Sequence, residues 1–367
     1  MSLQHQIALT FIKNIGPALA KSLIIHYGDI EKIFKASRTS LLNVPGFGEK
    51  RVNDLDLSAA LSRAEEELRF IEKNEVNVIF YTDSAYPKRL KNCADGPILL
   101  YSKGNMSLNP PHVISIVGTR NATEYGKQLC KDLVGELQQY NALIVSGLAL
   151  GIDVTVHKES LRQNLATVGV LGHGLDRIYP FQNRSTAEKM LENGGLLTEF
   201  PSGTIPDREN FPQRNRIVAG MADATVVIEA SVKGGALITA EIANSYNRDV
   251  FAFPGRVDDE YSEGCNFLIR NNKAALLTCA ADLAYSLGWE SNAEVSGKAV
   301  KQLALPMDLS PEEQIIFDTI HQNNAPLAID DLTIKTNMPM SQLTMNLLNM
   351  EMQGVIRSLP GKTYSVN

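Results

Sequence analysis

The feature that most constrains the fold is a series of short apolar runs, most of them rich in valine and isoleucine. These runs lie at 113–117, 142–145, 167–171, 196–199, 225–229 and 250–253. Stretches with helical character separate them, for example 127–140, 152–163 and 236–246. Strands that alternate with helices build βαβ units around a parallel sheet. The sequence therefore predicts an α/β core with a Rossmann-like, doubly wound parallel sheet, and we place it in residues 76–290.

The segment before this core, residues 1–75, is predicted to be a small helical domain. Two glycine-containing turns, 14–17 and 44–51, each precede an apolar or basic helical stretch. Both turns fit helix–hairpin–helix (SAM-like) units, in which backbone N–H groups at a helix start can approach a phosphate. A helical bundle with plain glycine turns is the alternative. The sequence leaves open whether this domain contacts DNA.

The segment after the core begins with a predicted linker, 291–306, and ends with a predicted winged-helix domain, 307–367. Ser310-Pro311-Glu312-Glu313 is a capping box with proline at the first helical position. Helices are expected at about 311–322, 329–335 and 341–353, with Gly354 able to cap the last. Strands at 355–359 and 363–366 would then form a hairpin. The third helix contains no lysine or arginine, so we favour protein docking or dimerisation over DNA-groove binding, although core packing explains part of its apolar content.

Composition limits the classes of function. The formal net charge is −6, so nucleic-acid binding would have to come from a local basic patch. The four cysteines are widely spaced and are expected to be reduced thiols, with no zinc site and no cofactor. No apolar run approaches the ~20 residues of a membrane span. The N-terminus lacks the pattern of a signal peptide, so a cytoplasmic protein is expected.

Glycines and basic residues follow the predicted strands, and these loops meet at one edge of the sheet. In open parallel sheets, ligands bind outside this carboxyl edge. Candidate binding residues are Gly118, Thr119, Arg120, Gly147, Arg208, Phe211, Arg214, Asn215, Arg216, Lys233, Gly234 and Gly235. A row of basic loops suits the successive phosphates of a nucleic-acid strand better than a single mononucleotide. Arg120 is predicted to bind phosphate, and Phe211 either stacks on a base or packs in the core.

Ser146, Asp153 and His157 suggest a catalytic triad, but nothing places the Ser146 hydroxyl against His157, so we reject that interpretation. Asp153 and His157 lie four residues apart on one helix and are expected to pair with each other. His173 is interpreted as a surface or packing histidine, not as a catalyst. No catalytic residue is predicted.

Several segments resemble one known family. They are "SIVGTRNATEYG", "IVSGLALGIDVTVH", "GVLGHGLDRIYPFQN", "LLTEFPSGTIPDRENFPQRNRIVAG", "VVIEASVKGGALITA" and "VFAFPGRVDDEYSEGCNFLI". Together they are similar to the DNA-processing protein DprA (Smf) family over about 113–270. The flanks resemble the family's helical and winged-helix domains more weakly.

The resemblance implies a protein that binds incoming single-stranded DNA in natural transformation and loads the RecA recombinase onto it. It also implies help in displacing single-strand-binding protein, a homodimer, and no enzymatic reaction. Arg120 matches the arginine of the family's G-[ST]-R turn, which contacts DNA. The residues implied to line the DNA groove are Arg208, Phe211, Arg214, Asn215, Arg216 and Lys233.

This sequence departs from the family at Leu150, where the family has arginine, and that change would either weaken binding or remove an internal ion pair. Two other functions remain possible. Nucleotide phosphoribohydrolases of the "lonely guy" (lysine decarboxylase-like) group share a P-G-G-x-G-T-x-x-E loop, of which Gly234, Gly235 and Glu241 are present. However, Leu237 and Ile238 replace the central glycine and threonine. The third possibility is a protein scaffold whose anion groove is vestigial.

Overall fold

The computed structural model describes residues 2–289, 309–323 and 325–366. They divide into two units, one up to Leu276 and one from Leu277 onward. The predicted linker at 291–306 lies outside the described residues. No described helix is both long enough and apolar enough to cross a lipid bilayer.

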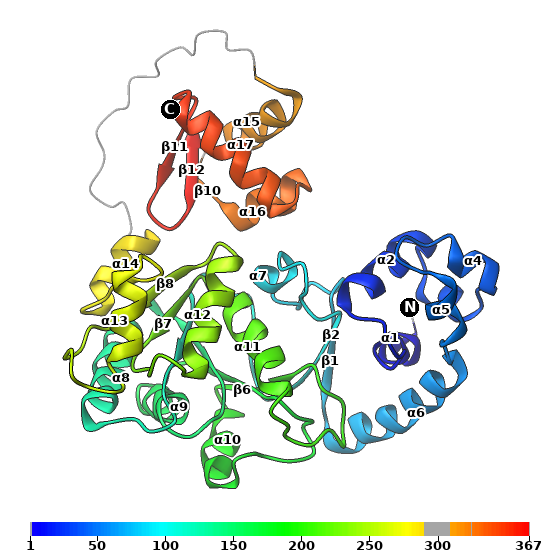
Figure 1. Ribbon diagram of the computed structural model, residues 1–367, viewed down its shortest axis with the longest axis horizontal. Coiled ribbons are helices and arrows are strands. Elements are labelled where there is room, and N and C mark those ends of the chain that lie inside the picture. The colour runs from blue at the N-terminus through cyan, green and yellow to red at the C-terminus, as the bar shows by residue number, and fades with distance from the viewer. Residues whose placement is uncertain (1, 290–308, 324, 367) are drawn as a thin grey trace. The chain divides into compact units, whose positions relative to one another are not determined.

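The first part of the chain is helical, as predicted (Figure 1). Its helices are α1 Leu3–Thr10, α2 Pro17–Tyr27, α3 Ile30–Phe34, α4 Arg38–Leu42, α5 Glu49–Asn53 and α6 Leu57–Asn74. Pro17 occupies the first turn of α2, and Gly28 ends that helix with a φ of 68°. Ile7, Leu23 and Ile33 of the first three helices are fully or almost fully buried in one apolar cluster. Burial of these side chains, at about 1.5–3 kcal/mol each, stabilises the packing of helices too short to persist alone.

Helix α6 is joined to the core by a buried carboxylate. Glu67 is only 1% exposed. Its two oxygens accept hydrogen bonds from the Ser202 backbone N–H at 2.9 Å and the Ser202 hydroxyl at 2.6 Å. Arg63, one helical turn earlier, lies 3.0 Å from the same carboxylate and donates to the Ser202 carbonyl. The helical domain therefore contacts the loop that follows strand β6, Gly194–Thr198, through hydrogen-bonded polar side chains.

The described part of the core contains one nine-stranded sheet with the order β1-β2-β6-β5-β4-β3-β7-β8-β9. Its strands are β1 Asn77–Phe80, β2 Leu99–Lys103, β3 Val113–Val117, β4 Leu143–Ser146, β5 Thr167–Val170, β6 Gly194–Thr198, β7 Ala224–Val227, β8 Asp249–Ala252 and β9 Ala275–Leu276. All six predicted strands are confirmed, with ends displaced by at most two residues. The predicted Rossmann-like core with a parallel sheet is confirmed by β3 to β9, and two further strands at one edge, β1 and β2, run antiparallel to their neighbours. Only the short α7, Lys88–Lys91, connects them, so they lack the crossover helix that forces parallel pairing.

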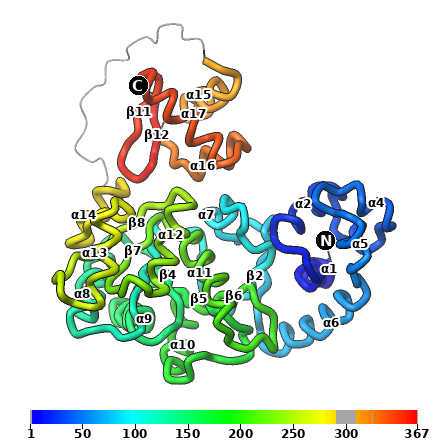
Figure 2. Tube along the Cα trace, viewed as in Figure 1, coloured from blue at the N-terminus to red at the C-terminus, as the bar shows by residue number. Residues whose placement is uncertain are grey.

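Helices cover both faces of the sheet (Figures 1 and 2). α8 Glu124–Leu137, α9 Ile152–Arg162 and α10 Arg184–Met190 follow β3, β4 and β5 and lie on one face. α11 Asn210–Gly220 and α12 Gly235–Ser245 pack against each other on the other face. The remaining helices here are η1 Gln138–Tyr140, η2 Phe181–Asn183 and α13 Glu263–Arg270. The predicted helices at 127–140, 152–163 and 236–246 are thus confirmed within a few residues.

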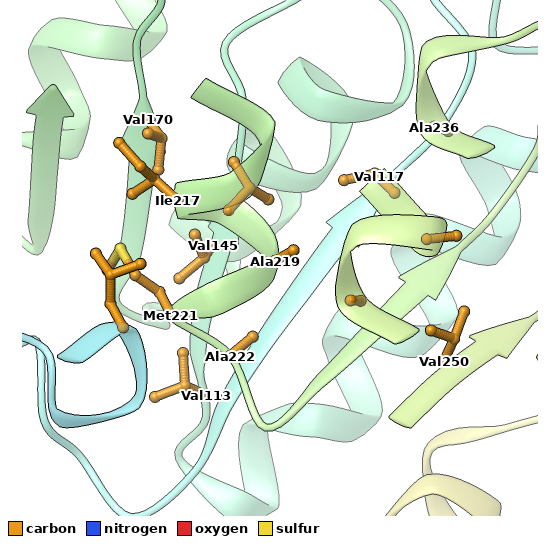
Figure 3. Close-up of a cluster of buried hydrophobic side chains, with 14 of the residues drawn as sticks. Val113, Val117, Val145, Val170, Ile217, Ala219, Met221, Ala222, Ala236 and Val250 are labelled. Carbon is orange, nitrogen blue, oxygen red and sulfur yellow. The ribbon is translucent and has the colours of Figure 1, made fainter. Parts of the chain in front are cut away.

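Figure 3 shows the apolar cluster between the sheet and α11 and α12. Strand residues such as Val113, Val145 and Val170 meet Ile217 and Met221, and all five are 0% exposed. Valine suits this position because its branched side chain packs on the pleated surface of a strand buried on both faces. The packing fixes α11 and α12, and hence their N-terminal turns, against the carboxyl edge of the sheet.

The second unit includes α14, Ala280–Leu287, and a winged-helix arrangement: α15 Pro311–Gln322, β10 Leu327–Ala328, α16 Ile329–Thr336, α17 Met340–Met352, β11 Ile356–Leu359 and β12 Thr363–Val366. The capping box is confirmed, since Ser310 and Glu313 each accept the other's backbone N–H. Gly354 follows α17 with a φ of 71°. The short β10 was not predicted; it pairs with β12. The apolar side chains of α17 divide: Leu343, Leu347 and Met350 are buried, whereas Met345, Leu348 and Met352 are exposed.

Candidate nucleic-acid interface

The candidate site lies at the point in the sheet where the order of the strands along the chain reverses. β3 pairs with β4 on one side and with β7 on the other. From β3 the chain proceeds to β4, and it returns to the other side of β3 only after β6. Helices leave such a point on opposite faces of the sheet and open a crevice beyond the strand ends. A cavity of about 350 Å³ occupies this crevice, lined by the loops after β3, β4 and β7 and by parts of α11 and α12.

The structure brings nine of the twelve predicted residues to this cavity. They are Gly118, Thr119, Arg120, Gly147, Phe211, Arg214, Asn215, Gly234 and Gly235. Arg208 and Lys233 are exposed on neighbouring loops and do not line the cavity wall that the structure describes. Arg216 lies elsewhere, as shown below.

The turn that carries Arg120 is rigid. The Thr119 backbone N–H donates to the Glu229 carbonyl at 2.7 Å, and its carbonyl accepts from the Ile152 N–H at 3.1 Å. A side chain at Gly118 would overlap Ile152, so only glycine lets β3 approach α9 this closely. The backbone thus holds Arg120 at the cavity mouth without using the Arg120 side chain.

Arg120, which is exposed, and Phe211 form a cation–aromatic pair. The guanidinium carbon of Arg120 lies 5.5 Å from the centre of the Phe211 ring, within the range of a cation–π contact. The Phe211 ring is half-buried, and it packs so closely on Gly172 that a side chain there would crowd it. The packing interpretation of Phe211 is thus confirmed in part, and stacking on a base stays a prediction. A smaller hollow adjoins the cavity and shares Arg120, Ala149, Phe211 and Arg214 with it.

Arg214 and Asp153 form a buried ion pair in the cavity wall. Arg214 Nη1 lies 4.0 Å from Asp153 Oδ2 and donates to the Val170 carbonyl at 3.1 Å. Burial raises the pKa of Asp153, and the Arg214 guanidinium opposes that shift. A side chain at Gly147 would overlap both charged groups. Arg214, which is only 7% exposed, therefore stabilises the wall of the cavity as well as giving it positive charge.

The predicted pairing of Asp153 with His157 is wrong. His157 Nε2 lies 2.6 Å from the Gly147 carbonyl and Nδ1 lies 2.7 Å from the Thr167 hydroxyl. A carbonyl only accepts, so Nε2 carries the proton, and burial lowers the pKa of His157 to about 4. Although the two residues share a helix face, Asp153 reaches Arg214 while His157 reaches β5.

The rejection of a catalytic triad is confirmed. The Ser146 hydroxyl donates to the Ile116 carbonyl at 2.6 Å, and both nitrogens of His157 are occupied by other groups. His173 is 1% exposed, and its Nδ1 lies 2.9 Å from the Gly174 carbonyl. It is thus a packing histidine and not a surface one.

Arg216, also predicted to line the groove, makes structural contacts instead. It forms an ion pair with Glu199 and donates to the Asp95 carbonyl at 2.5 Å. Successive residues of a helix are about 100° apart, so Arg214 and Arg216 project from nearly opposite sides of α11. Burial raises the pKa of Glu199, and Arg216 opposes that shift.

The prediction missed several residues of the cavity wall. The Asn121 amide donates to the Tyr261 hydroxyl at 3.0 Å and so connects the loops after β3 and β8. Ser231 and Glu260 also line the cavity. Asn121 was detectable because it follows Arg120 directly. The loop after β8 was expected at this edge, but nothing in the sequence marked Glu260 and Tyr261 as part of the cavity wall. The N-terminus of α12 also lies at the cavity, which Gly234 and Gly235 line. No side chain caps this helix at Gly234, and the space around Gly235 is open. The first backbone N–H groups of α12 are therefore available to a ligand in the cavity.

Comparisons with known proteins identify the family. Residues 77–288 match the family model described as DNA recombination-mediator protein A, which covers more than half of the chain. The chain belongs to the DprA (Smf) family. Residues 301–362 match the DprA winged helix domain, and residues 7–59 match the SAM-like helix-hairpin-helix tandem.

Individual DprA and Smf relatives agree with this assignment. The chain is 34% identical to Protein Smf of Synechocystis sp. over 393 residues, covering 98% of each chain. It is 40% identical to the DNA processing protein DprA of Bacillus subtilis over 202 residues, or 55% of this chain and 68% of the relative.

Two solved DprA structures are similar. The X-ray structure of DNA processing protein A from Streptococcus pneumoniae has a TM-score of 0.66 and 29% identity, covering 77% of this chain and 97% of that one. The structure from Helicobacter pylori has a TM-score of 0.52 and 30% identity, covering 57% and 94%. It is described as giving insight into a single-stranded DNA binding mode of that protein.

Proposed function

We propose that this protein binds single-stranded DNA along the carboxyl edge of its core sheet and loads a RecA-type recombinase onto that DNA in natural transformation or recombination. The observation that carries the proposal is the gathering of nine predicted residues, from loops far apart in the sequence, around one cavity. The Helicobacter pylori relative supports it through its described single-stranded DNA binding. A homodimer, contact with single-strand-binding protein, a cytoplasmic location and the lack of a catalytic reaction belong to the same proposal and follow from the family resemblance.

The chemistry of the cavity suits a nucleic-acid strand. Arg120 offers a planar fork for a phosphate, and Phe211 beside it offers a ring for a base. Stacking of a base on an aromatic side chain contributes about 1–3 kcal/mol and tolerates any sequence. The N-terminus of α12 adds N–H donors and a partial positive charge. These local features can overcome a net charge of −6, which by itself repels DNA.

The phosphoribohydrolase alternative is disfavoured by the position of Glu241. Its carboxylate lies 2.6 Å from the Lys273 amine on the protein surface and does not line the cavity wall that the structure describes. Ile238, in place of the threonine of that enzyme group, is 47% exposed. At the positions that match the threonine and the glutamate of that enzyme group, the loop therefore supplies neither a hydroxyl nor an acid to the cavity.

The test is a titration of fluorescent oligo-dT of about 35 nucleotides at two salt concentrations. Arg120→Ala should weaken binding about 10-fold or more, because a hydrogen bond to a charged group contributes about 1.5–3 kcal/mol. The slope of log affinity against log salt should decrease by about 0.7. Arg162→Ala is the charge-matched control, since Arg162 is exposed at the far end of α9.

Two results would contradict the proposal. If the parent protein does not bind the single strand at low salt, the groove is either vestigial or the site of an enzyme. An assay for release of base from nucleoside monophosphates distinguishes these two cases, because only the enzyme would release base. If the DNA binds but the protein does not speed assembly of a recombinase on DNA coated with single-strand-binding protein, the loading role is wrong.

A further inference from the structure

Two exposed aromatic side chains continue the candidate interface beyond Phe211. Tyr179 is 50% exposed and Phe181 is 72% exposed, in the segment between β5 and α10. The ring centres of Tyr179 and Phe211 are 6.4 Å apart, with 33° between the ring planes. Tyr179 also lines the smaller hollow that shares Arg120 and Phe211 with the main cavity. These aromatic residues were not among the predicted site residues.

The segment that carries them is held in place. Asn183 is 3% exposed, and its amide donates to the carbonyls of Leu148 at 2.9 Å and Ala149 at 3.2 Å, in the loop after β4. Upstream, the Thr198 hydroxyl donates to the His173 carbonyl at 2.9 Å. These anchors hold the backbone on both sides of the two exposed rings. Exposed aromatic side chains on an anchored segment indicate a contact surface.

A second arginine accompanies the second ring. The Arg184 guanidinium carbon lies 6.0 Å from the centre of Phe181, which repeats the arrangement of Arg120 over Phe211. Arg184 also lies 2.8 Å from Glu188, and both side chains are more than half exposed. Such exposed ion pairs contribute little, so a phosphate can replace Glu188 as the partner of Arg184. The surface formed by Tyr179, Phe181 and Arg184 is called the aromatic ledge below.

We propose that the aromatic ledge is a second stretch of the single-stranded DNA site, on which bases stack after the strand leaves Arg120 and Phe211. This inference rests on the proposed function. Its support is the repeat itself: two arginine–aromatic pairs match the alternation of phosphate and base along a strand, and Tyr179, two residues before Phe181, lies beside Phe211 of the first pair. A protein partner would use exposed aromatic residues too, but would not require that repeat.

The experiment compares oligo-dT of about six and about 20 nucleotides, because only the longer one can occupy both stretches. The double variant Tyr179→Ala/Phe181→Ala should weaken binding of the longer strand at least about five-fold more than binding of the shorter strand, which can reach Tyr179 but not Phe181. Tyr285→Ala, at an equally exposed aromatic residue of α14, is the control. An unchanged melting temperature of each variant excludes loss of fold. A large change in melting temperature is not expected, because the removed rings are at least half exposed.

Photo-cross-linking with 5-iodouracil in the longer strand identifies the contact directly. Cross-linked peptides containing Tyr179 or Phe181 would support the proposal. If Arg120→Ala weakens binding but the double variant binds both lengths normally and no such peptide is found, the ledge is not a DNA surface although the proposed function stands. If the double variant keeps DNA binding and loses only recombinase loading, the ledge contacts protein and the proposal is overturned. If Arg120→Ala has no effect either, the proposed groove itself fails.

Discussion

The buried pair of Asp153 and Arg214 should respond strongly to removal of one partner. Asp153→Asn keeps the shape of the side chain and removes its charge. Arg214 would then remain buried, with the Val170 carbonyl as the acceptor of its Nη1 and no hydrogen-bond partner at Nε. We expect a large loss of core stability and an altered cavity wall.

The magnitude follows from the geometry. At the observed 4.0 Å, two unit charges attract by about 4 kcal/mol with an effective dielectric constant of about 20. Breaking a buried ion pair by removing one partner costs about 3–5 kcal/mol in other proteins. The expected loss is therefore about 3–5 kcal/mol, a large part of the ~5–15 kcal/mol that stabilises a typical domain.

Because the chain has more than one domain, the loss is best measured by native-state hydrogen exchange of amides in β4 and β5. Arg214→Met and the double variant Asp153→Asn/Arg214→Met complete the cycle. The double variant should recover much of the stability, because it leaves no unpaired charge. If Asp153→Asn changes the exchange free energy by less than about 1 kcal/mol, the reasoning about this pair is refuted. DNA titration of a stable double variant then shows whether Arg214 also contacts phosphate.

Three further predictions concern single residues. As pH falls from 6.5 towards 4, the free energy of unfolding should decrease by up to about 3 kcal/mol. The reason is that His157 binds a proton in the unfolded state at about pH 6.5, whereas burial keeps it neutral in the folded state down to its pKa of about 4. Melting curves between pH 7.5 and 4.5 should show that the melting temperature of His157→Gln depends less on pH than that of the parent. Gly147→Ala should lower both the melting temperature and DNA affinity by forcing apart the adjacent ion pair, whereas Gly235→Ala, with no atom within 4 Å of the added carbon, should keep the melting temperature. Leu150 is 44% exposed and lines the smaller hollow. Leu150→Arg should raise DNA affinity at low salt and increase the slope of log affinity against log salt by about 0.7 in the oligo-dT titration. An unchanged slope would show that residue 150 does not contact the DNA.

Much of the core was predictable because buried parallel strands are continuous apolar runs. β3 and β7 are examples, and their buried valines and isoleucines left little ambiguity. The edge strands β1 and β2 were not predicted, because no crossover helix marks them and their contacts are partly with the N-terminal helices. The capping box at Ser310 was predictable because capping depends on residues only three apart.

The sequence by itself determined that glycine and basic loops meet at the carboxyl edge of a doubly wound sheet, because strand order along the chain and the handedness of crossovers constrain that edge. Only the tertiary structure decided which arginines serve the cavity. Arg120 is presented by a rigid turn, Arg214 is buried against Asp153, and Arg216 turns away to Glu199. These three differ in the direction of their side chains and in their burial, and neither is encoded by residue type or local spacing. For the same reason, the exposure of Tyr179 and Phe181 could not be predicted from the sequence, because it depends on the contact between the loop after β5 and the loop after β4.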